Sequence, residues 1–422
     1  MNQIQVEPEE RTFYCQVDTY LGRKDYLRGG RCVRLVGVEK ADYVRLTQNE
    51  YKEGVRTFVI DIEVPSFLKR AHSKIWKQEN RFHAKLMALL ELKLNEESVW
   101  YEVNVEVVEA GYSYFYSTFS ALPPTFFAAK TVKPARAPQL SVSPAPAQKL
   151  MGFMKATEAV RPLKAIDPGF GVLSFTAFHV GQGMCSMVHD KRHGVMFDAG
   201  AGKPVTRERY LAGLKKNELQ SLVNDFKSIP YFVLSHFDND HWNILAWDRS
   251  LRDKVRRIIV PKVKNRSARS VAFFDVEVKK KVDETAFVTI PLGGTSSVEG
   301  RRTQPSASDN NGHCLISVID IDGRLALAAG DYVYSRMKTD TEPSIGPWAA
   351  GPYAAVIVPH HGDEASAKQI PDCTANGKAF FSAGTHDTWD HPSGVSIDNH
   401  KKKGFQTIEN HTEENIIRKI LI

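Results

Sequence analysis

The chain has 422 residues, of which 42% are hydrophobic and 25% are charged, and its formal net charge at pH 7 is +7. This composition is typical of globular proteins and excludes a largely disordered one, and the length favours two domains over a single core. No apolar run approaches the roughly 18 residues of a membrane-spanning helix, and the acidic N-terminus lacks the features of a signal peptide. The five cysteines are widely spaced without a CxxC pair, so we expect a soluble cytoplasmic protein with reduced thiols.

Residues 1–127 are expected to form one small α+β domain of unknown role. Residues 101–107 alternate apolar and polar side chains, which is the period of a half-buried strand, and residues 56–64 are a second strand candidate. Between them, apolar residues recur at helical spacing and predict a helix: Ile75, Phe82, Leu86 and Leu89. The aromatic segment 112–116 has two interpretations, stacking on nucleic-acid bases or ordinary packing of a strand in the core.

Residues 128–167 are predicted to be an extended linker, because the segment is rich in Pro, Ala and Ser. Between Lys130 and Lys164 the only acidic residue is Glu158, whereas basic residues recur throughout. A basic linker can follow a phosphate backbone, and it can equally be a solvated tether.

Residues 168–422 are expected to form a second domain, of the α/β class. Short apolar runs, several of them followed at once by His, Asp or Gly, are strand candidates: 173–180, 194–198, 231–235, 315–319, 325–329 and 355–358. Core strands that present polar residues at their ends are the usual way in which α/β folds build a site.

The densest group of metal-capable side chains directly follows the apolar run 231–234. The segment from Ser235 to Trp242 reads SHFDNDHW, and its four His and Asp side chains are His236, Asp238, Asp240 and His241. In an extended segment the first two of these point to the same face, and the adjacent pair adds two donors where the chain turns. Such a cluster is costly unless a cation neutralises it. The alternative is a polar loop with fortuitous His and Asp residues.

Three later segments add further candidates: Gly330-Asp331, Val358 to Gly362 with His360 and His361, and Trp389 to Pro392 with His391. Each is weak by itself, because a lone Gly-Asp is usually a turn and a lone His is usually structural. Their joint occurrence after the dense cluster predicts one site assembled from several strand ends.

Seven segments occur in an order that resembles the metallo-β-lactamase superfamily: FHVGQG (178–183), FDAG (197–200), SHFDNDH (235–241), NNGHCLI (310–316), GD (330–331), VPHHG (358–362) and HP (391–392). Within that superfamily they are most similar to the hydrolase domain of ComEC-type DNA-uptake competence proteins. The resemblance covers about residues 170–415 and does not extend to the N-terminal domain. It implies an αββα sandwich with two divalent metal ions.

The resemblance implies one metal ion held by His236, Asp238 and Asp331. The second would be held by Asp240, His241 and His361, with Asp331 as a bridge. Asp198 and His179 would lie behind the ligands, where such residues orient a ligand histidine.

Two residues are implied to take part in catalysis. Asp240 would assist the nucleophile, and His391 would donate a proton or contact a phosphate. The resemblance assigns no role to His360.

Three departures from the family pattern bear on the metal site. Asp238 stands where the superfamily most often has a histidine, so Mn²⁺ or Mg²⁺ becomes an alternative to Zn²⁺. For the third motif either Asn311 or His313 would have to serve, which leaves the first site weak or incomplete. Met184 follows the Gly-Gln-Gly loop where competence-type proteins have an acidic residue.

The hypothesis from sequence is a two-metal nuclease that acts on DNA, in DNA processing or in defence against foreign DNA. Two metal ions would lower the pKa of bound water from about 15.7 toward about 7. Residues 249–281 are strongly basic, and phosphate contacts are expected from Arg256, Arg257, Lys262 and Lys264, although such a run is often only a solvated face. The N-terminal domain would recruit a partner protein or nucleic acid, and no membrane partner is expected.

Two alternatives remain open at this stage. One is a hydrolase of a small ester, lactone, thioester or nucleotide on the same fold, because a fold does not set the substrate. The other is a non-catalytic binding module whose metal site is incomplete.

Overall fold

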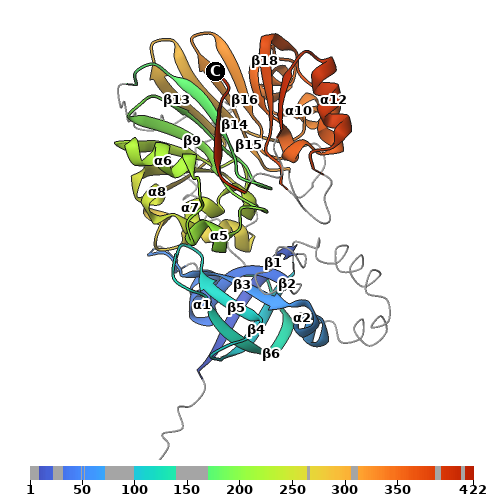
Figure 1. The fold of residues 1–422 in the computed structure, drawn as a ribbon. Coiled ribbons are helices and arrows are strands. Elements are labelled where there is room, and N and C mark those ends of the chain that lie inside the picture. Colours follow the sequence, from blue (N-terminus) through green and yellow to red (C-terminus); the bar gives the residue numbers. More distant parts are fainter. Residues whose placement is uncertain are drawn as a thin grey trace, which may run out of the picture.

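The computed structural model describes residues 9–21, 32–48, 50–51, 53–71, 99–138, 170–263, 267–305, 312–384, 391–409 and 414–422. A small barrel formed by the N-terminal residues packs against a larger layered domain (Figure 1). Among the described residues, no helix combines the length and the apolar character needed to cross a membrane.

The N-terminal strands close into a barrel in the order β1-β2-β3-β5-β6-β4. Their bounds are β1 (Glu10–Leu21), β2 (Cys32–Glu39), β3 (Thr57–Glu63), β4 (Trp100–Val107), β5 (Ser113–Ser117) and β6 (Thr125–Ala135), with helices α1 (Lys40–Thr47) and α2 (Val64–Ala71). The alternation in β4 points Tyr101, Val103 and Val105 into the barrel core, so β3 and β4 confirm the two predicted strands. The helix predicted around Phe82 lies outside the described residues.

The structure also decides the interpretation of the aromatic segment and changes one predicted boundary. Tyr114, Phe115 and Tyr116 of β5 are buried, so these three rings pack inside the protein and are not offered to bases, whereas Tyr112 is 56% exposed. Strand β6 pairs with β4 as far as Ala135, so the barrel continues into the segment expected to be linker. Residues 139–169 of that segment lie outside the described residues.

The second domain is built on two sheets with helices on both outer faces (Figure 1). The first sheet has the order β12-β11-β10-β9-β8-β7-β20, with β7 (Ser174–His179), β8 (Cys185–His189), β9 (His193–Ala199), β10 (Ser228–Val233), β11 (Val255–Pro261), β12 (Val282–Thr285) and β20 (Ile417–Ile420). The second runs in sequence order from β13 to β19: β13 (Phe287–Gly293), β14 (Ser296–Arg302), β15 (Leu315–Ile321), β16 (Arg324–Ala328), β17 (Tyr353–Ile357), β18 (Cys373–Phe381) and β19 (Gln406–Glu409).

Short helices cover the outer faces of the two sheets. On the first sheet lie α5 (Arg207–Leu211), α6 (Glu218–Asp225), α7 (Asn243–Trp247) and α8 (Arg249–Lys254). Helix α9 (Ala268–Val271) contacts β1 and β2 of the barrel. On the second sheet lie α10 (Tyr334–Lys338) and α12 (Gly394–Lys402), and α11 (Ile345–Trp348) packs against α10. The 3₁₀ turns are η1 (Asn239–His241), η2 (Ala272–Phe274), η3 (Lys279–Lys281), η4 (Pro359–Gly362) and η5 (Glu364–Ala367).

Strand β10 shows why the sequence of this domain contains short, continuous apolar runs. Phe232 and Leu234 pack into the core under the helices, while Tyr231 and Val233 pack into the core between the sheets. A strand covered on both faces needs apolar residues at successive positions. The four layers agree with the αββα sandwich expected for residues 168–422.

Candidate metal centre

The candidate metal residues lie where strands of both sheets end. His236 follows β10 of the first sheet, whereas Asp331 follows β16 and His361 follows β17 of the second. Strands β16 and β17 are parallel, so their carboxyl ends reach the same edge. The structure therefore brings together side chains that are 125 positions apart in the chain, from His236 to His361.

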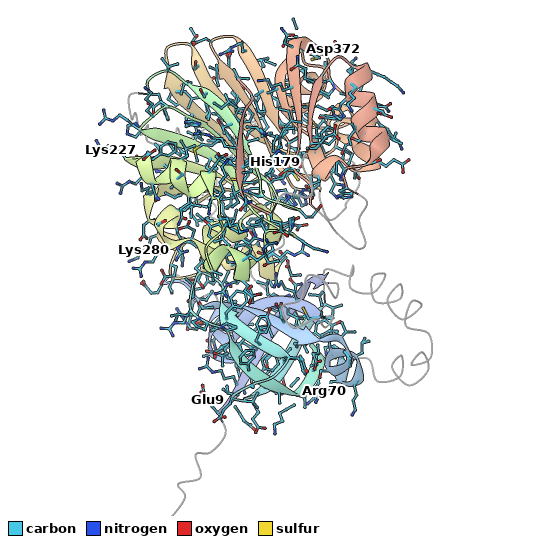
Figure 2. All side chains as sticks on the ribbon, viewed as in Figure 1. Glu9, Arg70, His179, Lys227, Lys280 and Asp372 are labelled. Carbon is cyan, nitrogen blue, oxygen red and sulfur yellow. The ribbon has the colours of Figure 1, made fainter. Side chains whose placement is uncertain are left out.

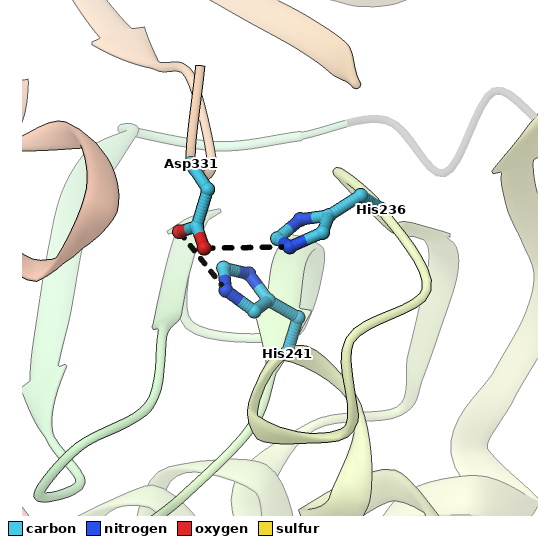
Figure 3. A group of neighbouring side chains, drawn as sticks. All are labelled: His236, His241 and Asp331. Atoms are coloured by element: carbon cyan, nitrogen blue, oxygen red, sulfur yellow. Dashed lines mark ion pairs between the residues drawn. The ribbon is translucent and has the colours of Figure 1, made fainter. Parts of the chain in front are cut away.

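Asp331 lies between the histidines, and each of its oxygens faces a different one (Figure 3). Oδ2 is 3.5 Å from Nε2 of His236, and Oδ1 is 3.2 Å from Nε2 of His241. Oδ1 is also 3.8 Å from Nε2 of His361. A carboxylate placed in this way can bridge two cations.

The side chains form two overlapping groups that could each hold a metal ion, His236 with His241 and Asp331, and Asp240 with His241 and His361. Asp240 Oδ2 is 3.2 Å from His361 Nε2, and Asp240 Oδ1 is 3.9 Å from His241 Nε2. Asp238 Oδ2 lies 3.6 Å from His236 Nε2, on the first side of Asp331. All six side chains that sequence suggested as ligands thus converge on one place.

Three atoms at the centre of this cluster are buried and make no hydrogen bond with any described residue: Nε2 of His236, Nε2 of His241 and Oδ1 of Asp331. His241 is 0% exposed, and a buried polar atom without a partner costs on the order of 1–3 kcal/mol. Imidazole nitrogens and carboxylate oxygens are ligands of divalent cations. The residues present therefore fit a bound metal pair.

Asp198 organises the cluster from behind. Its Oδ1 accepts a hydrogen bond from the Ser235 backbone N at 2.7 Å, and its Oδ2 accepts one from Ser235 Oγ at 2.8 Å. Oδ2 also lies 2.9 Å from Nδ1 of His241. Because a carboxylate accepts, it holds the proton of His241 on Nδ1 and leaves the lone pair of Nε2 facing Asp331.

The two adjacent histidines of η4 are fixed in the same way. Nδ1 of His361 lies 2.8 Å from the Ser382 carbonyl oxygen, and Nδ1 of His360 lies 2.8 Å from Asp363 Oδ2. Both histidines have positive φ, 49° for His360 and 54° for His361. This backbone is uncommon for residues other than glycine and turns both rings toward Asp331. His360 Nε2 lies 3.9 Å from Asp331 Oδ2, so this histidine belongs to the His236 side of the site.

Two glycines explain part of the surrounding sequence. A Cβ on Gly200 would lie 1.5 Å from the backbone oxygen of Asp240, so only glycine lets strand β9 end against the loop formed by residues 235–241. Gly330 has a φ of 56°, and a Cβ there would lie 2.5 Å from the side chain of Ser235. Both motif glycines therefore serve close backbone approach.

The pKa values in the cluster reflect its mixed charges. Burial by itself would lower the pKa of His236, but the carboxylates of Asp331 and Asp238 raise it well above its ordinary value. Burial would raise the pKa of Asp331, yet His241 and His236 hold it well below its ordinary value. The cluster therefore concentrates negative charge that attracts protons, or cations in their place.

His391 lies beside the cluster, with its ring centroid 5.7 Å from that of His360 and 6.2 Å from that of His361. Burial and the charges of His361 and His360 lower the pKa of His391 to about 4. The ring is therefore neutral at pH 7. Of the two roles expected from sequence, this suits contact with a phosphate better than proton donation.

The remaining predicted residues are placed less favourably. His179 is buried between the sheets with its ring centroid 4.6 Å from that of Phe380, so its described contact is one of packing (Figure 2). His313 is exposed, with Nδ1 3.3 Å from Nη1 of Arg302, and does not join either donor group. Asn311 lies outside the described residues.

Of the described residues in the basic run, Arg256 and Arg257 do not lie beside the candidate site, where phosphate contacts were expected from sequence. Arg256 and Arg257 lie at the amino end of β11, and four residues of strand separate Arg257 from the carboxyl end beside the cluster, about 13 Å. Arg257 instead lies 3.6 Å from Asp283. Lys262 follows the carboxyl end of β11 and is exposed, while Lys264 lies outside the described residues.

Other cations of the same run support the fold. Lys254 donates to the carbonyl oxygens at the end of α6, Val223, Asn224 and Phe226, at 2.6–2.8 Å. Arg252 is buried and donates to the carbonyl oxygens of Leu245, Ala246 and Phe119. Their charges stabilise helix ends and a domain contact.

Sequence reasoning missed two residues at the site. Arg269 was only one cation of the basic run, yet its Nη1 donates to Asp238 Oδ1 at 2.5 Å. Asp18, from the barrel, lies 2.8 Å from Nε of Arg269. No local sequence signal identifies this contact, because it joins two domains.

Residues 179–371 match the sequence profile of the metallo-beta-lactamase superfamily. No curated protein sequence matches the chain. Similar solved structures include a mutant of CmlA beta-hydroxylase, with 16% identity over 58% of this chain and 53% of that chain and a TM-score of 0.35. The metallo-beta-lactamase fold protein YhfI from Bacillus subtilis has 10% identity over 58% of this chain and 100% of that chain, with a TM-score of 0.33. Human tRNase Z, short form, has 13% identity over 47% of this chain and 84% of that chain, with a TM-score of 0.30.

Proposed function

We propose that the protein is a two-metal phosphodiesterase that cleaves DNA, from the premise that residues 179–371 match the sequence profile of the metallo-beta-lactamase superfamily. Members of this superfamily are metal-dependent hydrolases. The observation that carries the proposal is the position of Asp331, whose two oxygens face His236 on one side and His241 on the other.

In this proposal His236, Asp238 and Asp331 would hold the first metal ion. Asp240, His241 and His361 would hold the second together with Asp331. When bound, two divalent cations supply Lewis acidity and a water whose pKa falls toward about 7. The mixture of imidazole and carboxylate suits Zn²⁺ or Mn²⁺, and Mg²⁺ less well.

The protein's own groups hold the geometry and move protons. Asp198 keeps His241 in one tautomer through the 2.9 Å contact. Asp240 is the carboxylate of its donor group, its side chain is 33% exposed, and in this proposal it accepts the proton of the attacking water. Gln182 Nε2 lies 3.2 Å from Nδ1 of His391, and when it donates there the proton of the neutral ring lies on Nε2, as a donor for a phosphate oxygen.

A polyanionic substrate is supported by charge. The chain has a net charge of +7, and Lys262 is exposed at the carboxyl end of β11, the end at which β10 leads into His236. We place the activity in DNA processing or in defence against foreign DNA, with the barrel as the part that meets a partner. Similarity to competence-type hydrolase domains in the segment 235–241 supports the choice of DNA.

The test is incubation of the purified full chain with supercoiled plasmid, linear duplex and single-stranded DNA, each with Mn²⁺, Zn²⁺ or Mg²⁺. We expect cleavage that requires a metal ion and disappears in Asp240→Asn, a substitution that keeps the shape of the side chain. Asp253→Asn is the matched control, because Asp253 is an exposed carboxylate, 66% accessible, on α8. Cleavage that survives in Asp240→Asn would show a contaminating nuclease.

One observation favours a second candidate, a hydrolase of a small ester, lactone or nucleotide. Several cations of the basic run, including Arg252 and Lys254, are used inside the fold and are not available to a long polyanion. This candidate predicts turnover of small chromogenic esters or phosphodiesters with little dependence on salt, whereas DNA binding should weaken steeply with salt.

A further inference from the structure

The metal cluster touches the N-terminal barrel through one arginine. Arg269, on α9, places its three guanidinium nitrogens on two different carboxyl-bearing residues. Nη1 donates to Asp238 Oδ1 at 2.5 Å, Nε lies 2.8 Å from Asp18 Oδ1, and Nη2 donates to the backbone oxygen of Asp18. Asp18 belongs to β1 of the barrel, and Asp238 belongs to the candidate metal site.

Burial makes this contact more than a surface ion pair. The side chain of Asp18 is 2% exposed and that of Arg269 is 17% exposed. Exposed ion pairs contribute little, but removing one partner of a buried pair leaves an uncompensated charge. Asn239, in the loop formed by residues 235–241, also donates to Asp18, from Nδ2 to Oδ2 at 3.4 Å.

The backbone holding Arg269 is also attached to the barrel. The backbone N of Ala268, at the start of α9, donates to Gln16 Oε1 at 2.5 Å. Gln16 and Asp18 are two positions apart on β1, at a β-bulge between Val17 and Thr19, and both side chains contact α9. Two side chains of one barrel strand therefore set the position of α9.

Further contacts hold the two domains together away from Arg269. Asp275 Oδ2 accepts hydrogen bonds from the backbone N and the Oγ1 of Thr57, both at 2.8 Å. Phe119, in the connection from β5 to β6, inserts into the core of the second domain beside Trp242 and Phe273. These contacts hold the barrel in a fixed position against the second domain, next to Arg269.

We propose that the barrel is a structural part of the metal centre: Asp18 and Arg269 are positioning residues that hold Asp238 for the first metal ion. With Oδ1 of Asp238 bound by Arg269, Oδ2 is the oxygen that faces His236, at 3.6 Å. Asp18 balances the arginine charge, so that Arg269 orients the carboxylate without withdrawing it from the site. This inference rests on the proposed metal-binding function.

The experiment is a calorimetric titration of the metal-free full chain with Mn²⁺ and with Zn²⁺, on wild type, Asp18→Asn and Arg269→Lys. Lysine keeps the charge but cannot reach both carboxylates in a fork. We expect the affinity of one of the two metal ions to fall by about 10–100-fold in both variants, as is usual when the partner of a ligand is lost, while the other ion binds as in wild type. Arg207→Gln is the matched control, because Arg207 crosses the same interface to the carbonyl oxygens of Ser120 and Leu122.

The outcomes separate the two proposals. Two metal ions bound with wild-type affinity by both variants overturn the inference and leave the proposed function standing. Wild type that binds no metal overturns the proposed function and the inference with it. Equal weakening of both ions, or the same weakening in Arg207→Gln, indicates a general loss of structure and also overturns the positioning role. Thermal unfolding of each variant without metal shows whether it is folded. If Asp18→Asn does not fold, the metal titration of Arg269→Lys alone decides the inference.

Discussion

The barrel and the second domain each bury a group of opposite charges, and the two groups differ in how completely they are paired. In the barrel, Arg34 and Asp61 form a forked pair, with Nε to Oδ1 at 2.8 Å and Nη2 to Oδ2 at 2.7 Å. In the second domain, His236, His241 and Asp331 face one another at 3.2–3.5 Å and leave three atoms without a hydrogen bond.

The difference separates a structural ion pair from a binding site. Each oxygen of Asp61 accepts a hydrogen bond from Arg34, so the pair is satisfied without a bound ion. The histidine nitrogens around Asp331 point toward a common centre and make no hydrogen bond there, so they are free to bind a divalent cation. A buried charge is therefore a weak sign of function until its partners are counted.

The largest effect on metal binding and DNA cleavage is expected from a substitution of Asp331. Asp331→Asn should abolish binding of both metal ions and reduce DNA cleavage by at least the roughly 10²–10³-fold that loss of one electrostatic stabiliser costs. The reason is that one carboxylate serves both donor groups. Metal content after dialysis and cleavage rates measure it. Retention of two metal ions by this variant would contradict the bridging position.

The ion pair of Arg34 and Asp61 should behave in the opposite way: its loss should affect stability and leave metal binding unchanged. Asp61→Asn should lower the free energy of unfolding by about 3–5 kcal/mol, because it leaves Arg34, whose side chain is only 14% exposed, without the countercharge of Asp61. Metal binding should be unchanged in the protein that remains folded. Chemical denaturation of metal-free protein measures the first effect and metal titration the second. In the double variant Arg34→Met with Asp61→Leu, most of the lost stability should return.

A buried histidine with satisfied nitrogens tests the same distinction by pH. His400 Nδ1 lies 2.7 Å from the Ser396 carbonyl oxygen and Nε2 lies 3.2 Å from the Tyr334 hydroxyl. Burial lowers the pKa of His400 to about 4, so the unfolded chain, with a histidine pKa of about 6.5, binds the proton more readily. The stability contributed by neutral His400 is present above about pH 6.5 and is lost as the pH falls toward 4.

Between pH 7.5 and 5 this loss should amount to about 2 kcal/mol. We expect His400→Phe to remove that part of the pH dependence from the unfolding of metal-free protein, measured by denaturant titration. Parallel pH profiles for wild type and variant would show that His400 is already solvated in the folded state.

The smallest effect concerns exposed cations. Arg256→Gln combined with Arg257→Gln should leave DNA affinity and its salt dependence unchanged, because these residues lie at the far end of β11. Lys262→Gln, at the near end, should reduce the salt slope by about one. Binding to a labelled duplex over a series of salt concentrations measures both. A reduced salt slope in the Arg256 and Arg257 variant would instead support the phosphate contacts expected for these residues from sequence.

The sequence by itself determined the class of the second domain and most of the candidate ligands. Strand runs such as 231–235 are recognisable because burial on both faces requires consecutive apolar residues. His236, Asp238, Asp240 and His241 stand within six positions, and such local density is visible without a structure. The order of the later motifs then pointed to Asp331 and His361.

Only the tertiary structure decided which distant groups meet. The pairing of strands in a sheet is non-local. Because β11 runs parallel to β10, the carboxyl end of β11 lies beside the candidate site, and Arg256 and Arg257 lie at the opposite end. The tertiary structure turned His313 outward to Arg302 and closed the N-terminal strands into a barrel. It also brought Asp18 to Arg269 across 251 positions, a contact that no local pattern encodes, because it depends on how two separately packed domains dock.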